Sequence, residues 1–265
     1  MRAHEIDYRI IGDDMQFVEI ELDPDESVIA EAGSLMMMDQ EIQMETIFGD
    51  GSNNESGLMG KLFSAGKRLL TGESLFMTVF TNQGRGKKQV SFAAPYPGKI
   101  IPVDLSQYQG KIICQKDAFL CAAKGVSVGV EFQRKIGVGF FGGEGFIMQK
   151  LEGDGLSFVH AGGTICEKEL QPGQVLKVDT GCLVALTKDV GYDIEFVKGI
   201  KTALFGGEGL FFATLRGPGK VWVQSLPFSR LADRVFAAAP KAGGKSVEQG
   251  SILGSIGDLI GGDND

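Results

Sequence analysis

A pattern that recurs three times along the chain limits the folds that this sequence can adopt. Segment 140–159, FFGGEGFIMQKLEGDGLSFV, matches segment 204–223, LFGGEGLFFATLRGPGKVWV, at an offset of 64 residues. A weaker copy at 69–80, LLTGESLFMTVF, precedes the middle copy by 71 residues. Such a period indicates one structural unit used several times, in which each copy buries its apolar face against its neighbours.

A second element precedes each copy of this pattern. Three short apolar runs share the position: SLMMMD (34–39), AFLCAA (118–123) and GCLVAL (181–186). The spacing from this run to the glycine-glutamate pair is nearly equal in the second and third copies, and about 13 residues longer in the first. The sequence therefore predicts three units, at about 15–92, 98–160 and 165–226.

The segments inside these units have the composition of β-strands. Stretches such as MQFVEIEL, VSVGVEF and KVWVQSL alternate or run in Val, Ile and aromatic residues. The chain has 39 glycines, and many stand in turn sequences such as EGDGL and RGPGK. Many short strands separated by glycine turns are typical of sandwiches and barrels. We predict an all-β fold, in which three degenerate β-sandwich-like repeats surround a pseudo-threefold axis within a single domain over 1–240.

Two segments are predicted to be helical instead. Leucines recur at helical spacing in 58–70, with cations largely on the other side, which favours a short amphipathic helix. A second, closing helix is expected over 228–238, before Pro240. Residues 241–265 are rich in glycine and are predicted to form a flexible tail.

The helix at 58–70 has two interpretations. It packs on its own sheet, or it contacts a partner or the surface of a membrane, because three cations stand beside its apolar residues in an otherwise acidic protein. The candidate contact residues are Leu58, Lys61, Leu62, Phe63, Lys67 and Arg68.

The overall charge excludes one class of partner. The formal net charge is −8, whereas a nucleic-acid-binding protein needs a basic surface to displace counterions. The N-terminus carries acids where a signal peptide needs an apolar run, and no apolar stretch is long enough to span a bilayer. The four cysteines stand among apolar residues without metal-ligand spacing, so we expect buried, reduced thiols. A cytoplasmic protein is expected.

Two glycine strings imitate nucleotide-binding motifs. APKAGGKS (239–246) resembles a phosphate loop, but a helix precedes it and only a short tail follows, so the required strand and helix are missing. GVGFFG (137–142) has dinucleotide-type spacing, yet the chain continues as a strand where a helix must begin. Neither string predicts a cofactor, and we expect none.

The glycine-glutamate pair is the one polar feature that the repeat emphasises. It occurs three times, as Gly72-Glu73, Gly143-Glu144 and Gly207-Glu208. Three related carboxylates could bind a cation or a basic partner. Alternatively, each pair forms a tight turn in which the glutamate caps backbone amides. The two histidines, His4 and His160, do not accompany a recognisable nucleophile, so the sequence predicts no catalytic residues.

Several segments together resemble the AIM24 family. They are 66–80 (GKRLLTGESLFMTVF), 92–105 (FAAPYPGKIIPVDL), 115–130 (QKDAFLCAAKGVSVGV) and the two GGEG copies. The resemblance covers about residues 5–235. It implies a fold like that of the tryptophan RNA-binding attenuation protein, without implying RNA or tryptophan binding. The family has no established enzymatic activity, and its mitochondrial member is linked to inner-membrane organisation.

Three functional hypotheses follow. The first is a non-catalytic scaffold or binding protein that forms a homo-oligomer or holds a protein partner, with a membrane surface as a further candidate contact. The second is a small-molecule or metal-binding protein that uses Glu73, Glu144 and Glu208. The third is an enzyme whose active site has no recognisable motif, which would require a deep pocket with convergent polar groups.

Overall fold

The computed structural model describes residues 2–48, 76–134, 146–196 and 211–239. Internal contacts divide the chain into two units, Met1–Arg230 and Leu231–Asp265. All the β-strands described lie in the first unit, and helix α3 (Phe228–Ala238) crosses from the first into the second.

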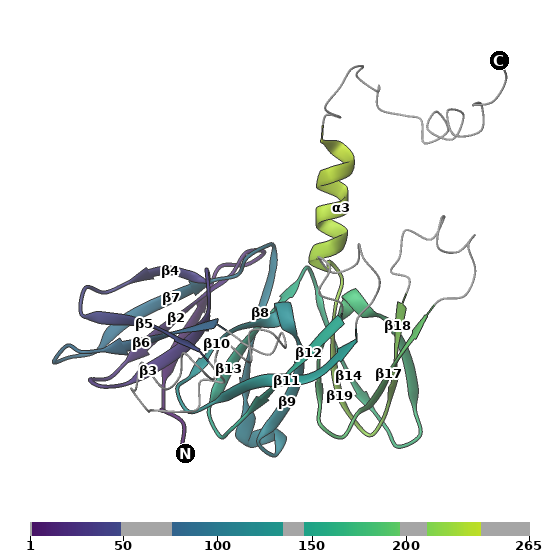
Figure 1. Cartoon of the computed structure of the whole chain (residues 1–265), viewed down its shortest axis with the longest axis horizontal. Helices are drawn as coiled ribbons and strands as arrows, with labels where there is room; N and C mark the ends of the chain where they lie inside the picture. The colour runs from purple at the N-terminus through teal and green to yellow at the C-terminus, as the bar shows by residue number, and fades with distance from the viewer. Residues whose placement is uncertain (1, 49–75, 135–145, 197–210, 240–265) are drawn as a thin grey trace. The chain divides into compact units, whose positions relative to one another are not determined.

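The described part of the first unit forms four antiparallel sheets (Figure 1). The first has the order β1-β2-β7-β4, and its strands are Asp7–Ile11, Phe17–Leu22, Lys88–Ala93 and Leu35–Met38. The second has the order β5-β6-β3-β10-β13-β8, with Ile42–Phe48, Phe76–Asn82, Ser27–Glu31, Phe119–Ala123, Leu156–Gly162 and Gly98–Asp104.

The third sheet has six strands and the fourth has three. The third has the order β11-β12-β9-β16-β19-β14, with Ser127–Arg134, Phe146–Glu152, Lys111–Gln115, Leu183–Thr187, Gly219–Gln224 and Ile165–Leu170. The fourth has the order β15-β18-β17, with Val175–Asp179, Phe211–Arg216 and Gly191–Phe196. Within the described ranges, three 3-10 turns connect strands: Leu105–Tyr108, Lys116–Ala118 and Thr180–Cys182.

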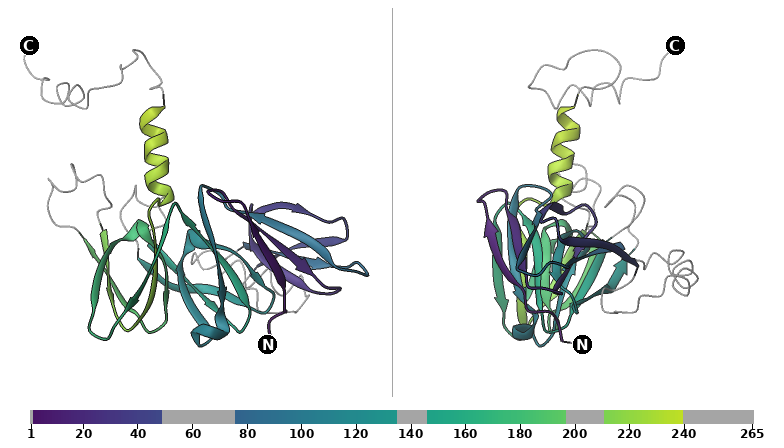
Figure 2. Two further views of the ribbon diagram at one scale, coloured as in Figure 1. Left: turned by 180° about the vertical axis from the view of Figure 1, so that it is seen from behind. Right: turned by 90° about the vertical axis from the view of Figure 1, so that its left-hand side faces the viewer.

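Both six-stranded sheets are built from strands that are far apart in the chain. In the second sheet β3 pairs with β10, and in the third β9 pairs with β16. Figure 2 shows the strands of the first unit from two further sides. All five residues of β10 are buried, which explains why this strand reads as an unbroken apolar run, FLCAA, rather than as an alternating one.

Large side chains from several strands fill the core. Phe92 and Phe158 belong to the main cluster, and Phe146 belongs to a second cluster between the third and fourth sheets. The rings of Phe80 and Phe92 meet edge to face, with centroids 5.1 Å apart. Such pairs add about 0.5–1.5 kcal/mol to the stabilisation from area burial.

The structure confirms the all-β class and one of the two predicted helices. The closing helix expected over 228–238 is α3, with the same bounds. The helix expected at 58–70 and the tail at 241–265 lie outside the described residues. The pseudo-threefold arrangement and the likeness to the attenuation protein stay predictions. No helix within the described ranges is long and apolar enough to cross a membrane.

We predict that Gly162→Ala destabilises the fold whereas Gly86→Ala does not. A Cβ at Gly162 would stand 2.0 Å from the Leu226 carbonyl oxygen, whereas a Cβ at Gly86 would meet nothing within 4 Å. Relief of the first clash requires backbone movement, so Gly162→Ala should lower the free energy of unfolding by about 1–3 kcal/mol. Chemical denaturation measures both variants, and equal stability of the two would contradict the prediction.

Candidate functional site

The residues singled out from the sequence lie outside the described part of the chain. They are Gly72, Glu73, Gly143, Glu144, Gly207 and Glu208 of the repeated pair, and Leu58, Lys61, Leu62, Phe63, Lys67 and Arg68 of the 58–70 segment. The described strands β6, β12 and β18 begin shortly after the three glycine-glutamate pairs. Both hypotheses for these residues therefore stay predictions.

The two histidines occupy separate, partly or fully buried positions. His4 Nδ1 accepts a hydrogen bond from the Ser27 amide at 2.9 Å, and burial, together with Lys124, lowers the pKa of His4. His160 is fully buried, and its ring meets that of Tyr96 at 4.4 Å, edge to face. Burial lowers the pKa of His160 to about 4, so this ring is neutral at pH 7. Among the described residues, no group of three or more His, Cys, Asp or Glu side chains could hold a metal ion.

One carboxyl group stands in an unusual environment. Glu31, at the end of β3, has its pKa raised to about 7, because burial disfavours the charged form and the nearby Asp117 adds repulsion. Lys116 opposes this shift. A perturbed carboxyl group can indicate a functional site. Here its neighbours form part of the junction between β3 and β10, which favours a structural origin.

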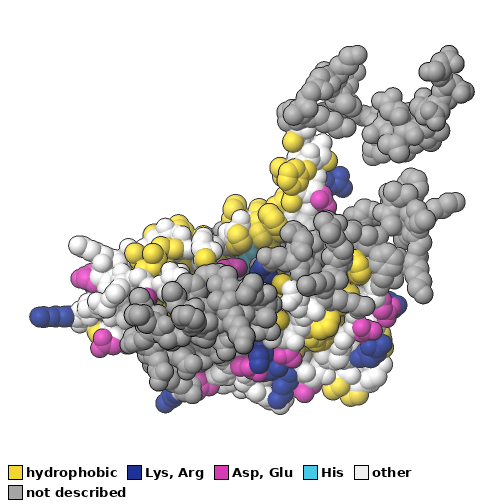
Figure 3. Space-filling model, viewed as in Figure 1, with side chains coloured by type: hydrophobic (Ala, Val, Ile, Leu, Met, Phe, Trp, Pro, Cys, Tyr) yellow, Lys and Arg dark blue, Asp and Glu magenta, His cyan; other side chains and the backbone are white. Residues whose placement is uncertain are grey.

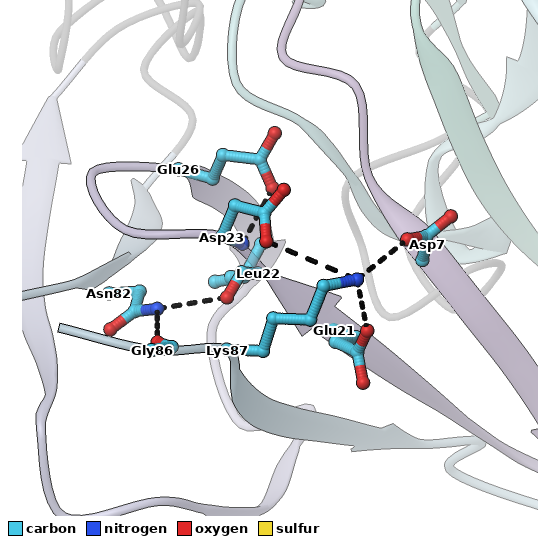
Figure 4. A network of polar contacts seen from close by, with 8 residues as sticks. All are labelled: Asp7, Glu21, Leu22, Asp23, Glu26, Asn82, Gly86 and Lys87. Atoms are coloured by element: carbon cyan, nitrogen blue, oxygen red, sulfur yellow. Dashed lines mark hydrogen bonds and ion pairs between the residues drawn. The ribbon is translucent and has the colours of Figure 1, made fainter. Parts of the chain in front are cut away.

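The ion-pair network around Lys87 is exposed (Figure 4). The Lys87 Nζ lies 2.6 Å from Glu21, 3.4 Å from Asp7 and 4.0 Å from Asp23. The ammonium group thereby connects β1, β2 and the start of β7. Exposed pairs of this kind contribute about 0–1 kcal/mol each, so the network assists the packing of the N-terminal strand and does not form a binding site.

Beneath this network, Asn82 anchors the turn that precedes Lys87. Its side chain is fully buried, and Nδ2 donates to the carbonyl oxygens of Leu22 and Gly86, both at 2.8 Å. The first bond satisfies the buried carbonyl of Leu22, and the second holds the exposed turn at Gly86, so Asn82 has a structural role.

A shallow, open hollow lies between β14 and β15. Its lining combines charged residues of β14 with Leu170, Val175 and Leu176. A ligand in this hollow would keep much of its surface in water, unlike one in the enclosed pockets that hold most small molecules.

Among the described edge strands, β1 exposes Tyr8 and Ile11, β5 exposes Met44, and β4 and β15 also expose apolar residues. On β4, the exposed fractions of Met36, Met37 and Met38 are 51%, 48% and 41%. Hydrophobic side chains gather at the upper left of Figure 3, where Figure 1 places β4. On β15, Val175 is 58% exposed, and Leu176 is half-buried. Exposed apolar side chains on strands with open backbone groups are typical of surfaces that pair with another strand.

Sequence reasoning identified the methionine run at 34–39 as a strand but did not predict its exposure. The run differs from the related runs in composition, because it has three consecutive methionines where AFLCAA and GCLVAL have none. Methionine is flexible and polarisable, and it is common on surfaces that adapt to a partner.

The cysteines differ from the expectation in part. Cys114 and Cys121 are buried, and burial raises the pKa of both thiols, which makes them unreactive. Cys182 is half-buried, and Cys166 is exposed. Cys166 is exposed because β14 is an edge strand, in which polar neighbours also face the solvent. All four are free thiols.

Comparison with known proteins gives consistent results. The model of the family described as "Mitochondrial biogenesis AIM24" matches residues 8–226. "Uncharacterized protein M6_Spy0233" of Streptococcus pyogenes serotype M6 is 32% identical over 224 residues, which are 82% of this chain and 85% of the relative. The crystal structure of protein SPYM3_0169 from Streptococcus pyogenes matches with a TM-score of 0.69 over 89% of this chain and 100% of that one. At 24% identity, this last match shows the fold alone.

We predict that Glu31→Gln stabilises the protein at pH 8 and leaves its stability at pH 4 nearly unchanged. The pKa of Glu31 is about 7 in the folded state against an ordinary value of 4.5. As pH rises between these values, the unfolded chain releases the proton first, so wild-type stability falls and then stays lower above pH 7. The amide avoids this loss, which amounts to about 2 kcal/mol after allowance for partial exposure.

The measurement is urea denaturation of both proteins at the two pH values. His160 also titrates, but it is present in both proteins, so its contribution cancels in the difference. Glu45→Gln, at an exposed position on β5, serves as the matched control and should change stability by less than about 0.5 kcal/mol at either pH. An equal effect of Glu31→Gln at pH 4 and pH 8 would show that charge is not the cause.

Proposed function

The chain belongs to the AIM24 family, and we propose that it is a non-catalytic scaffold that assembles with further copies of itself in the cytoplasm. The observation that carries this proposal is the pair of exposed apolar edges on β4 and β15. Such edges associate with other strands unless they are covered. The four free thiols are those expected of a reducing compartment.

The proposal includes the three repeated units at about 15–92, 98–160 and 165–226. Strand pairing supports them, because strands at the same place in each unit pair in the same order. One set of three strands has the orders β2-β7-β4, β8-β13-β10 and β14-β19-β16. The other set has the orders β5-β6-β3, β11-β12-β9 and β17-β18-β15.

In this description, successive units share a sheet. Strand β3 of the first unit pairs with β10 of the second, and β9 of the second pairs with β16 of the third. Two strands lack the equivalent pairing with another unit. Within the described residues, β4 has no partner from a preceding unit, and β15 has none from a following unit.

The other hypotheses gain no support from the described contacts. A cation site at Glu73, Glu144 and Glu208, and a membrane or protein contact through 58–70, involve residues outside the described ranges. An enzymatic activity would need converging polar groups in a deep pocket. Burial raises the pKa of Tyr96, with smaller contributions from Asp117 and Glu31, and the Tyr96 ring contacts that of His160. Burial is also the chief cause of the shifts in the pKa values of Glu31 and His160, so these groups by themselves assign no reaction. The ligand of a binding function stays unassigned.

We predict that the wild-type protein assembles and that Met37→Asp weakens this assembly. A carboxylate on the exposed edge of β4 would be buried on association, so its desolvation should raise the dissociation constant by about tenfold or more. Light scattering over a dilution series measures the molar mass, which is 28.4 kDa for one chain.

Met15→Asp is the matched control for this experiment. Met15 is 61% exposed, but it lies in the turn between β1 and β2 rather than on a strand edge. This variant should assemble like the wild type. A wild-type mass of one chain at every concentration would overturn the proposed function, and equal weakening by both substitutions would show that β4 is not involved.

A further inference from the structure

We propose that β15 of one copy of the chain pairs antiparallel with β4 of a second copy, repeating between chains the pairing that joins β3 to β10 and β9 to β16 within the chain. This inference rests on the proposed self-assembly and specifies which edges meet. The partner is a second copy because the two open edges complement each other. Strand β4 lacks a neighbour equivalent to β3 and β9, which β15 would supply, and β15 lacks a neighbour equivalent to β10 and β16, which β4 would supply.

The register on the β15 side follows from the pairing of three related strands. Phe80, Leu151 and Leu215 occupy equivalent places in the repeated sequence pattern and lie opposite Val28, Ile112 and Leu176. Residues 28–30 of β3 therefore correspond to 112–114 of β9 and to 176–178 of β15. At the two internal junctions, Ala30 lies opposite Cys121, and Cys114 lies opposite Ala185. On β15 the equivalent position is Val178.

The register on the β4 side follows from a shared irregularity. Strands β4, β10 and β16 each skip one residue against the strand on their inner side, between Leu35 and Met37, Phe119 and Cys121, and Leu183 and Ala185. This common bulge makes Met37 the equivalent of Cys121 and Ala185. The proposed junction therefore places Val178 opposite Met37, Lys177 opposite Met38 and Leu176 opposite Asp39.

Burial supports this assignment. The equivalent strands at the internal junctions are almost wholly buried. All five residues are buried in β10, and four of five are buried in each of β3, β9 and β16. Strand β4 exposes three consecutive methionines, and β15 has no fully buried residue. Pairing the two would cover both apolar edges, along with the apolar side of the hollow beside β15.

The other edge strands differ from β4 and β15, because their equivalents in the other units are also unpaired or are covered by an added strand. Strands β5, β11 and β17 are equivalent and lie at sheet ends in all three units, as do β8 and β14 in two units. Their equivalent in the first unit, β2, is covered by the added N-terminal strand β1. Only β4 and β15, among the described strands, are open where their equivalents are paired.

One position on β15 departs from the pattern. Lys177 stands where β3 and β9 carry Ile29 and Ile113, and its Nζ binds the Glu195 carboxylate at 2.9 Å. The aliphatic part of a lysine side chain can cover an apolar neighbour while the ammonium stays in water. Opposite Met38, the aliphatic part of Lys177 would cover the methionine and leave the ion pair with Glu195 at the margin of the junction.

The pairing is heterologous, because two different edges meet. Each chain then offers both edges, so copies add head to tail and produce a closed ring or an open filament, according to the rotation between them. Pairing of β4 with β4, or of β15 with β15, would instead stop at a dimer.

Disulfide trapping tests the register. The Lys124 amide donates to the Ser27 carbonyl oxygen, and hydrogen-bonded pairs alternate along antiparallel strands. The Ala30–Cys121 pair is thus of the closer, non-hydrogen-bonded kind, as would be Val178 opposite Met37. The variant Met37→Cys/Val178→Cys, in a Cys166→Ser background that removes the exposed native thiol, is oxidised mildly and analysed by denaturing gel and peptide mass spectrometry.

We expect covalent multimers linked through positions 37 and 178. Each single variant and the out-of-register pair Met37→Cys/Lys177→Cys, whose thiols would face opposite sides of the sheet, should link several-fold less. Light scattering on the same reduced samples reports assembly independently. A 37–37 or 178–178 link in the single variants, or assembly without a 37–178 link, would overturn this inference and leave the proposed function intact. A single-chain mass throughout would overturn both.

Discussion

Backbone hydrogen bonding between strands from distant parts of the chain is the constraint on which this structure depends. At the centre of the two larger sheets, β10 and β16 have neighbours on both sides. A buried amide or carbonyl group without a partner costs free energy comparable to that of a lost hydrogen bond. These buried strands can therefore exist only because β3 and β9 are brought beside them, and this pairing joins segments about 70 to 95 residues apart in sequence into continuous sheets.

The same constraint makes the strand edges the most informative surfaces of the protein. An edge strand carries unpaired backbone groups, and apolar side chains upon it increase its tendency to associate. Polar and charged residues reduce that tendency on β14, where Glu167, Lys168 and Glu169 stand. Strand β4 instead exposes three methionines, whose flexible side chains can adapt to a neighbouring strand. We propose that edges such as β14 stay open to water, whereas β4 is used for assembly.

Two buried ionisable groups make the stability of the fold depend on pH. His160 has a pKa lowered to about 4, so its contribution to stability is lost as pH falls from 6.5, because the unfolded chain takes up the proton first. Glu31 acts in the opposite direction, since its raised pKa lowers stability as pH rises towards 7. Both shifts arise chiefly from burial, and the two groups lie on different strands, β3 and β13.

The sequence by itself determined the all-β class, the strand character of the apolar runs and the helix at 228–238, because periodicity, turn residues and a terminating proline act over a few neighbouring positions. It also carried the resemblance that identifies the family. It could not distinguish the exposed run 34–39 from the buried run 118–123, since both are short and apolar. Only the tertiary structure decided that difference, because burial of a strand depends on whether a distant strand lies beside it, and no local pattern records that partner.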